Sequence, residues 1–342
     1  MQRLRIGVVG AGSVGCYVGG KIVAADAADV VFVGRARLRE EIAAHGMSVK
    51  DLGDDPVTVP PSRLAFATEM AELGGCDAVL CCVKSAQTRE VAEGLGKVLR
   101  SDAVVVSLQN GVRNPAVLRE ELGSRPVVPG IVSFNVVSRG AGLFHRTMDG
   151  PLMLGACPAS VAAALRSARL DVTVRDDLAP DQWTKLLVNL NNAISALSGA
   201  PTRALLLSPG YRRVIAAVVE EAMTLLRAAN IQPARLRGVP VGWMPLVLRL
   251  PTPLVRVIIR AQMKVDPEAR SSMWEDLTRG RATEVDYLNG EIVRVAGTTS
   301  TPAPLNARIV DLVHQAEAAG RGSPGLDADA LWKTLGASPA SR

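Results

Sequence analysis

Three glycines near the start of the chain have the spacing of a phosphate-binding turn. The apolar run 6–9 predicts a buried strand, Gly10, Gly12 and Gly15 follow it, and residues 16–25 favour a helix. In that context Gly10 permits a tight turn, Gly12 lets the backbone approach a pyrophosphate, and Gly15 lets the helix lie close to the strand. The first N–H groups of the helix and its dipole would face the phosphates. An ordinary tight turn between a strand and a helix is the alternative interpretation. We expect a dinucleotide to be bound by Gly10, Ala11, Gly12, Ser13, Val14 and Gly15.

The residues after the second predicted strand bear on which dinucleotide is bound. Residues 29–33 predict that strand, and a site that prefers NAD would place Asp or Glu at its end to bind the ribose 2′-hydroxyl. This chain has Arg35 and Arg37 there instead. Because a guanidinium suits a 2′-phosphate, we expect Arg35 to bind it and the cofactor to be NADP(H). The alternative is that both arginines are solvated charges at the start of the next helix.

Polar residues also follow two later strands. The apolar segment 76–83 is followed by Lys84, and the segment 103–108 by Gln109, Asn110 and Gly111. Ligands of an open α/β sheet bind beyond the carboxyl ends of its strands, so we expect Lys84 and Asn110 at the cofactor crevice. An Asn-Gly turn without function is a common alternative. Two strand ends that supply polar groups to one crevice favour a functional role.

The second half of the chain contains a lysine suited to acid–base chemistry. Lys185 and Asn189 are four residues apart in a predicted helix and share one face, and Asn192 follows three residues later on the same side. Their neighbours are apolar, so Lys185 is a candidate for a partly buried group with a shifted pKa. Taken alone, the pattern is also that of a surface lysine on an amphipathic helix.

A later polar block can flank two helix starts. Ser271 or Ser272 can cap one helix, and Thr283 or its neighbours the next. Glu284 lies near that second start, where the helix dipole by itself favours an acid.

Length and composition restrict the classes of protein and partner. A chain of 342 residues is long for one core, so we expect two domains. With 48% hydrophobic and 21% charged residues, the composition is that of a soluble globular protein. The formal charge of +6 fits anionic ligands such as a phosphorylated cofactor and a carboxylate substrate. Nucleic acid is the rival partner, but dense Lys/Arg tracts are missing and aromatic residues are only 3%.

Cysteine usage and apolar patterning favour a cytoplasmic protein without a metal site. The five cysteines have no metal-ligand spacing and only three histidines accompany them, so we expect reduced thiols. The N-terminus enters its strand almost at once, without a signal-peptide pattern. The apolar stretch 239–259 is interrupted by prolines and contains Arg249 and Arg256, which favours two helices over a membrane span.

The periodicity of the chain changes near residue 177. Before it, strands and helices alternate, which predicts a Rossmann-type doubly wound sheet. Residues 127–154 form short β-rich runs that we expect to close this sheet as antiparallel strands. Beyond residue 177 strand patterns vanish, and helices are predicted over residues 181–197, 209–229, 241–249, 253–263, 272–279, 284–295 and 304–319. The predicted fold class is α/β, with a Rossmann-type NADP-binding domain (1–177), an all-α substrate and catalytic domain (178–325) and a C-terminal tail (326–342).

The order of these motifs resembles the ketopantoate reductase family (2-dehydropantoate 2-reductase) over nearly the whole chain. That family has G-x-G-x-x-G, a V-K at a strand end, a Q-N-G turn, K-L-x-x-N, S-M-x-x-D and G-R-x-T-E-x-D-x-x-N-G. The matching residues are Gly10–Gly15, Val83-Lys84, Gln109-Asn110-Gly111, Lys185-Leu186 with Asn189, Ser272-Met273 with Asp276, Gly280-Arg281, Thr283-Glu284, Asp286 and Asn289-Gly290.

The resemblance implies an oxidoreductase that reduces ketopantoate to pantoate with NADPH, on the route to coenzyme A. It implies Lys185 as proton donor and Asn110 in contact with both cofactor and substrate. Asn189 and Ser272 would bind substrate, and Glu284 would act at the ternary site against substrate or cofactor. Hydride transfer to a keto carbon leaves negative charge on the oxygen, and an ammonium group supplies both charge stabilisation and the proton.

Two positions depart from the family pattern. Many members have a further asparagine eight residues after the lysine, where this chain has Ala193 beside Asn192, which we assign to substrate binding. Another family asparagine falls near Arg203. These differences keep open a related NAD(P)-dependent 2-hydroxy- or imino-acid dehydrogenase with a different 2-keto acid. A dinucleotide-binding protein without catalysis is a third interpretation, against which the presence of Lys185 argues. We expect a small 2-keto acid as partner, neither nucleic acid nor membrane, and leave a homodimer open.

Overall fold

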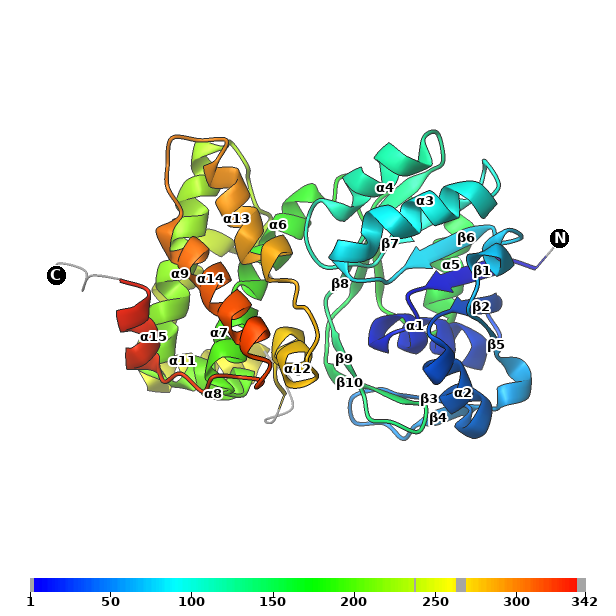
Figure 1. Ribbon diagram of the computed structural model, residues 1–342, viewed down its shortest axis with the longest axis horizontal. Coiled ribbons are helices and arrows are strands. Elements are labelled where there is room, and N and C mark those ends of the chain that lie inside the picture. The colour runs from blue at the N-terminus through cyan, green and yellow to red at the C-terminus, as the bar shows by residue number, and fades with distance from the viewer. Residues whose placement is uncertain (1–2, 237, 263–268, 337–342) are drawn as a thin grey trace. The chain divides into compact units, whose positions relative to one another are not determined.

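The chain folds into two compact units, Met1–Leu178 and Ala179–Arg342. The computed structural model describes residues 3–236, 238–262 and 269–336, and only the backbone of residues 259–262 (Figure 1). Among the helices it describes, none is long and apolar enough to cross a membrane.

Within the described residues, the N-terminal unit is organised around an eight-stranded sheet of order β12-β11-β8-β7-β6-β1-β2-β5. Six neighbouring strands are all parallel, in the order β8, β7, β6, β1, β2 and β5. At the other edge β11 runs antiparallel to β8, and β12 is parallel to β11. The predicted Rossmann-type α/β fold is confirmed. The strands are β1 (Arg5–Val9), β2 (Asp29–Val33), β5 (Ala65–Ala67), β6 (Ala78–Cys81), β7 (Val104–Ser107), β8 (Val127–Val132), β11 (Leu152–Leu154) and β12 (Val172–Val174).

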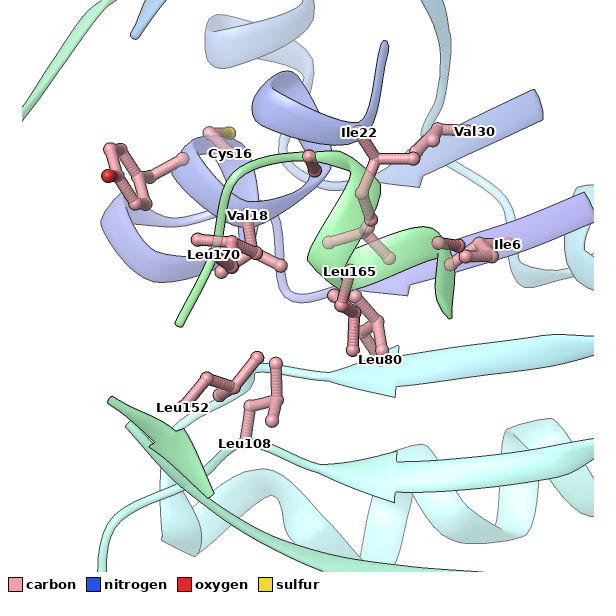
Figure 2. Close-up of a cluster of buried hydrophobic side chains, with 14 of the residues drawn as sticks. Ile6, Cys16, Val18, Ile22, Val30, Leu80, Leu108, Leu152, Leu165 and Leu170 are labelled. Atoms are coloured by element: carbon pink, nitrogen blue, oxygen red, sulfur yellow. The ribbon is translucent and has the colours of Figure 1, made fainter. Parts of the chain in front are cut away.

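Helices cover both faces of this sheet. Every residue of β6 and β7 is buried, as expected for parallel strands with helices on either side. Figure 2 shows the core on one face, where Val18 and Ile22 of α1 and Leu165 of α5 meet Leu80 of β6. A second core on the other face includes Leu95 of α3. The helices are α1 (Ser13–Ala24), α2 (Ala36–His45), α3 (Thr88–Val98), α4 (Asn114–Leu122) and α5 (Ala159–Ser167).

A second sheet corrects one prediction. The runs within 127–154 do not all close the main sheet, because β9 (Asn135–Ser138) and β10 (Leu143–Met148) leave it. In the part of the chain that the structure describes they join β3 (Met47–Lys50) and β4 (Val57–Val59) in a four-stranded sheet of order β4-β3-β10-β9. The β pattern was correct, but it could not identify β3, about a hundred residues earlier, as the partner of β10. The strand β4 was not predicted.

A buried ionic cluster joins the second sheet to α1. The Asp51 carboxylate accepts hydrogen bonds from the Tyr17 hydroxyl and the Lys21 ammonium, and Arg146 Nη1 lies 3.7 Å from it. The guanidinium of Arg146 also lies over the Phe134 ring, 5.0 Å from its centre. Burial alone would raise the pKa of Asp51, but the bonds from Lys21 and Tyr17 outweigh it and leave that pKa lowered. Asp51 therefore compensates two cations in a largely buried place.

The C-terminal unit is helical, as predicted, and is built around α9. Buried residues such as Val214, Val218, Ala222 and Leu225 recur along one face of α9. This helix contacts α7, α8, α10, α13, α14 and α15. The helices are α6 (Ala179–Asn189), α7 (Asn191–Ser198), α8 (Thr202–Leu207), α9 (Pro209–Ala228), α10 (Met244–Arg249), α11 (Thr252–Gln262), α12 (Ser272–Thr278), α13 (Asn289–Ala296), α14 (Pro304–Ala319) and α15 (Ala328–Thr334).

Two predicted helices are interrupted. The stretch 181–197 divides into α6 and α7 at Leu190, where the Asn191 side chain donates to the Val188 carbonyl at 2.6 Å and competes with the helical ladder. The stretch 284–295 becomes a 3₁₀ turn, η5 (Val285–Tyr287), and then α13. Leu288 between them has φ −114° and ψ −87°, outside the helical region. Apolar spacing indicated the buried faces of these helices but not these breaks.

Other elements of this unit lay outside the predictions. The helix α8 was missed, and so was a short hairpin of β13 (Arg235–Leu236) and β14 (Val239–Pro240), with Gly238 at φ +82°. The predicted end of a helix at Met263 lies outside the described residues. The segment 326–342, set apart as a tail, contains α15, and Leu331 of that helix is fully buried. The helix α15 is therefore packed against α9.

The ionic cluster gives a test of the fold. The Lys21 and Asp51 side chains are only 9% and 26% exposed. Asp51→Ala should lower the free energy of unfolding by about 2 kcal/mol, because it leaves the poorly solvated Lys21 ammonium without its carboxylate, whereas Arg146 keeps its ion pair with Asp149. The difference from the parent should shrink as the pH falls below about 4, where Asp51 is protonated in the unfolded chain. Urea unfolding at several pH values measures both effects.

Asp26→Ala is the matched control, since Asp26 pairs with Arg3 at the surface with side chains 68% and 45% exposed. It should lower the stability much less than Asp51→Ala does, because solvent screens an exposed ion pair. Equal losses for the two variants would contradict the assigned role of Asp51.

Candidate active site

The glycine turn of the N-terminal unit has the geometry that phosphate binding needs. Gly10 has φ +83°, and a Cβ there would lie 2.5 Å from the backbone nitrogen of Val83. A Cβ at Gly15 would lie 2.8 Å from Gly10 O. At Gly12, by contrast, it would meet nothing nearer than Gly10 O at 4.0 Å, and Gly12 is exposed. Gly10 and Gly15 are therefore required by packing, whereas Gly12 leaves an open backbone surface at the start of α1.

The start of α1 suits an anion. Its N-cap is Gly12, and its first turn contains no acidic residue that would repel a phosphate. Ser13 and Val14 form that turn. Because a helix N-terminus carries a partial positive charge and N–H groups that have no acceptor within the helix, it can hold a pyrophosphate.

Arg35 lies next to this turn along the sheet edge. The backbone nitrogens of Gly10 and Ala11 both donate to Val33 O, at 3.1 and 3.2 Å, so the end of β2 is fixed to the glycine turn. A Cβ at Gly34 would lie 2.8 Å from the Ala11 Cβ. Arg35 follows immediately as the exposed N-cap residue of α2. It can thus offer its guanidinium to a group bound at the turn.

Lys84 and Asn110 follow the next two strands at the same edge. Cys82 N donates to Val9 O at 2.8 Å, which ties the end of β6 to the end of β1. Leu108 N donates to Cys81 O at 2.9 Å and ties β7 to β6. Lys84 and Asn110 come just after these links and are half-buried. The structure therefore places the four predicted cofactor positions of this unit at the carboxyl ends of four adjacent strands, β2, β1, β6 and β7.

Behind these loops lies a buried polar network that the sequence analysis missed. Its members are Ser85, Thr88, Ser107, Gln109 and Asn114. Gln109 was named from sequence only as part of a turn motif and the other four were not singled out, although polar residues at buried positions are a signal in retrospect.

In the C-terminal unit, Lys185 and Glu284 act on one another. Burial lowers the pKa of Lys185 to about 8, although the Glu284 carboxylate opposes this shift. Lys185 stands on α6 among buried leucines, and Glu284 directly precedes η5. Thr283 N donates to Glu317 Oε1 at 2.7 Å, which attaches the Glu284 segment to α14. The shifted pKa predicted for this lysine is therefore present.

The proposed substrate residues lie on three helices of the same unit. Asn189 is one turn after Lys185 on α6, Asn192 is on α7, and Ser272 begins α12; the two asparagines are half-buried and Ser272 is exposed. Ser271 caps α12 by accepting from Trp274 N at 3.1 Å, and its hydroxyl donates to Asn192 O at 3.0 Å. This contact fixes the start of α12, with Ser272, against α7.

The two departures from the family pattern lie in different surroundings. Ala193 is fully buried in the core of α7, so no polar group is available at that position. Arg203 is exposed on α8. Substrate selection at these two positions stays a prediction.

All five cysteines are free thiols. In the part of the chain that the structure describes, no three His, Cys, Asp or Glu side chains gather in a way that could hold a metal ion. The groups available for chemistry are thus an anion-binding turn with flanking cations in one unit and a lysine with a shifted pKa in the other.

Comparison with known proteins agrees with this arrangement. Residues 6–159 match the family described as ketopantoate reductase PanE/ApbA, and residues 177–317 match its C-terminal part. The 2-dehydropantoate 2-reductase of Halobacterium salinarum is 28% identical over 325 residues, which are 92% of this chain and 99% of that protein. The 2-dehydropantoate 2-reductase of Archaeoglobus fulgidus is also 28% identical, over 93% of this chain and 99% of that protein.

Solved structures share the fold. A ketopantoate reductase of the PanE/ApbA family from Ralstonia eutropha JMP134 has a TM-score of 0.79 at 29% identity, over 93% of this chain and 100% of that chain. D-mandelate dehydrogenase, solved with NADH and anilino(oxo)acetate, has a TM-score of 0.77 at 19% identity, over 93% of this chain and 99% of that chain. The two family matches together span most of the sequence, and the chain therefore belongs to the ketopantoate reductase family of oxidoreductases.

Proposed function

We propose that this protein reduces ketopantoate to pantoate with NADPH, as a step towards pantothenate and coenzyme A. The observation that carries the proposal is Lys185, whose pKa burial lowers to about 8 beside Glu284, in a chain that matches the reductase family along most of its length. A lysine with a pKa near neutrality is still largely protonated at pH 7 and is a stronger acid than an exposed lysine.

The N-terminal unit would hold the cofactor. The open backbone surface at Gly12 accommodates a pyrophosphate, and the tight contacts at Gly10 and Gly15 keep the turn in that shape. Arg35 would bind the ribose 2′-phosphate, and Lys84 would add a second cation at the strand ends. NADPH, when bound, supplies the hydride for the keto carbon.

The remaining residues would bind the substrate and complete the reaction. As the keto oxygen gains negative charge, the Lys185 ammonium stabilises it and delivers the proton from Nζ. The Asn110 amide would orient cofactor and substrate. Asn189, Asn192 and the Ser272 hydroxyl would bind the substrate through hydrogen bonds. Glu284 supports the charged form of Lys185 and can accept from a substrate hydroxyl.

A related dehydrogenase of another 2-keto acid is the alternative function. Ala193 favours it, because this buried position lacks the polar side chain that many family members have there. Steady-state assays with a panel of 2-keto acids, each with NADPH and NADH, distinguish the two proposals. The highest kcat/KM should belong to ketopantoate; a decisively higher value for another keto acid would favour the alternative.

A cofactor prediction concerns Arg35. Arg35→Ala should raise the KM for NADPH about 10- to 100-fold, because a charge-assisted bond to the 2′-phosphate contributes about 1.5–3 kcal/mol. The KM for NADH should barely change. Arg37→Ala is the control, since Arg37 is also exposed and lies on the first turn of α2. If the parent protein uses both cofactors with equal efficiency, the assignment of NADP(H) is wrong.

A catalytic prediction concerns Lys185. Lys185→Met should lower kcat by at least about 100-fold, as is typical for a lost general acid, with little change in cofactor affinity. In the parent, kcat should be constant below about pH 8 and fall above it as the ammonium deprotonates. That decrease should be missing in the variant. Near-parental kcat in Lys185→Met would mean that another group donates the proton.

The same variant should be more stable than the parent. The pKa of Lys185 is lower in the folded than in the unfolded chain, so the folded state resists protonation and the charge is destabilising at pH 7. Its removal should raise the free energy of unfolding by about 1–3 kcal/mol. If the variant is more stable than the parent and yet has a lower kcat, the lost activity comes from the missing ammonium group and not from misfolding. Lys84→Ala is the internal control, because it should act chiefly on NADPH affinity.

We also propose that the protein forms a homodimer in the cytoplasm. Large apolar side chains are exposed along residues 236–257, on the hairpin, η4 (Val241–Trp243), α10 and α11. They are Leu236, Val239, Trp243, Leu246, Leu254 and Val257. Such a concentration on a surface favours association with another protein surface. A relative from Staphylococcus aureus, 18% identical, is described as a dimeric ketopantoate reductase.

Light scattering after gel filtration tests the dimer. The parent should have twice the mass of one chain, and Leu246→Glu combined with Val257→Glu should give monomers. Val57→Glu is the control, since Val57 is 56% exposed on β4 in the other unit and should leave the mass unchanged. A monomeric parent at assay concentrations would rule the proposal out.

A further inference from the structure

One buried side chain, Asn114, links the two loops that carry Lys84 and Asn110. It is the first residue of α4 and is 4% exposed. Its Nδ2 donates to Ser85 Oγ at 3.0 Å and to Asn110 O at 2.5 Å. Ser85 directly follows Lys84, so a single amide group contacts the loop after β6 and the loop after β7.

A second layer holds the Asn114 amide itself. Thr88 Oγ1 lies 2.8 Å from Asn114 Oδ1 and can donate to it. The Gln109 amide donates to Thr88 Oγ1 at 2.7 Å, and Ser107 Oγ donates to Gln109 Oε1 at 3.0 Å. These residues are all at most 5% exposed. The network therefore runs from the last residue of β7 to the start of α3 and the start of α4, helices that lie side by side in Figure 1.

This network fixes geometry that packing alone would not fix. Hydrogen bonds in a low-dielectric interior are strong and directional, and a network whose members are all paired favours one arrangement of the groups that it joins. The bond to Asn110 O restrains the backbone of Asn110 just before Gly111, which turns the chain at φ +85°. The bond to Ser85 Oγ restrains the residue next to Lys84 in the same way. Apolar side chains could fill this space but could not set these backbone positions.

We propose that Asn114 is a positioning residue for the reduction: it holds the two loops in one geometry, so that Lys84 and Asn110 engage the cofactor together. This inference rests on the proposed function. Asn114 touches neither cofactor nor substrate and acts through Lys84 and Asn110. Thr88 and Gln109 support it by orienting its amide.

Graded substitutions test this role in the full-length protein. Asn114→Ala removes both contacts that Asn114 makes with the loops, while the bond from Ser85 Oγ to Asn110 O at 3.2 Å remains. It should raise the dissociation constant of NADPH at least tenfold and lower kcat at least tenfold. Thr88→Val keeps the bonds from Asn114 to Ser85 and Asn110 and should have a smaller effect on both quantities. Thr88→Ser keeps the hydroxyl and should restore values near those of the parent. NADPH binding is measured by fluorescence titration, and kcat with saturating ketopantoate.

Thr147→Val controls for stability, because Thr147 is 1% exposed in β10 and accepts from Asn135 Nδ2 at 3.2 Å. It should lower the melting temperature in the same range as Thr88→Val and leave the NADPH dissociation constant unchanged. If Asn114→Ala lowers the melting temperature but, like Thr147→Val, changes neither NADPH binding nor kcat, the network is only structural and the proposal is overturned.

A double-mutant cycle separates positioning from general loosening. If Asn114 acts on NADPH through Lys84, the variant with both Lys84→Ala and Asn114→Ala should bind NADPH little more weakly than the weaker-binding single variant. Effects that multiply fully would mean that Asn114 acts independently of Lys84, which contradicts the proposal.

The proposed function is tested separately by the parent. A parent that binds NADPH and reduces ketopantoate, with an unaffected Asn114→Ala variant, would overturn the role of Asn114 and leave the proposed function intact. A parent that binds neither NADPH nor NADH would overturn both.

Discussion

The N-terminal unit depends on a close approach of backbone segments around Gly10. Strand β1 ends between the ends of β2 and β6, and no side chain fits there: a Cβ on Gly10 would lie 2.5 Å from Val83 N, and one on Gly15 would lie 2.8 Å from Gly10 O. The same contacts that exclude side chains hold three strand ends and the start of α1 in register. Lys84 directly follows Val83, so the steric constraint that shapes the phosphate turn also decides where a flanking cation lies.

The C-terminal unit provides the opposite condition, a costly charge at a half-buried position of α6. Lys185 is destabilised as an ammonium by burial, and Glu284 only partly compensates, so its pKa falls to about 8. The helices α9, α13 and α14 of the same unit contact one another. Under the proposed function the chemistry explains this cost, because a fully solvated lysine would be a weaker acid and a fully paired lysine would hold its proton too tightly.

Sequence predicted the features that local patterns determine. The glycine turn, the buried parallel strands and the amphipathic faces of α9 and α14 follow from spacing within a few residues, and the structure has them where expected. Pairing over long distances was not predictable in the same way, which is why β9 and β10 were assigned to the wrong sheet. The break at Leu190 depends on one side-chain hydrogen bond from Asn191, and the network of Asn114 depends on residues from four elements. No periodic pattern in the sequence indicates the helix break or the network.

The block 280–290 shows why a family motif does not by itself identify the reacting group. Gly280 adopts φ +61°, and Thr283 Oγ1 accepts from Val285 N at 3.2 Å and so starts η5. Asn289 is fully buried, and its amide donates to Asn306 Oδ1 at 3.0 Å, which joins α13 to α14. Each of the motif residues Gly280, Thr283 and Asn289 therefore has a structural role. Glu284 lies in the same block, and its charge acts on Lys185. The surrounding motif residues hold the segment that carries this carboxylate, so under the proposed function they would act indirectly, through the position of Glu284.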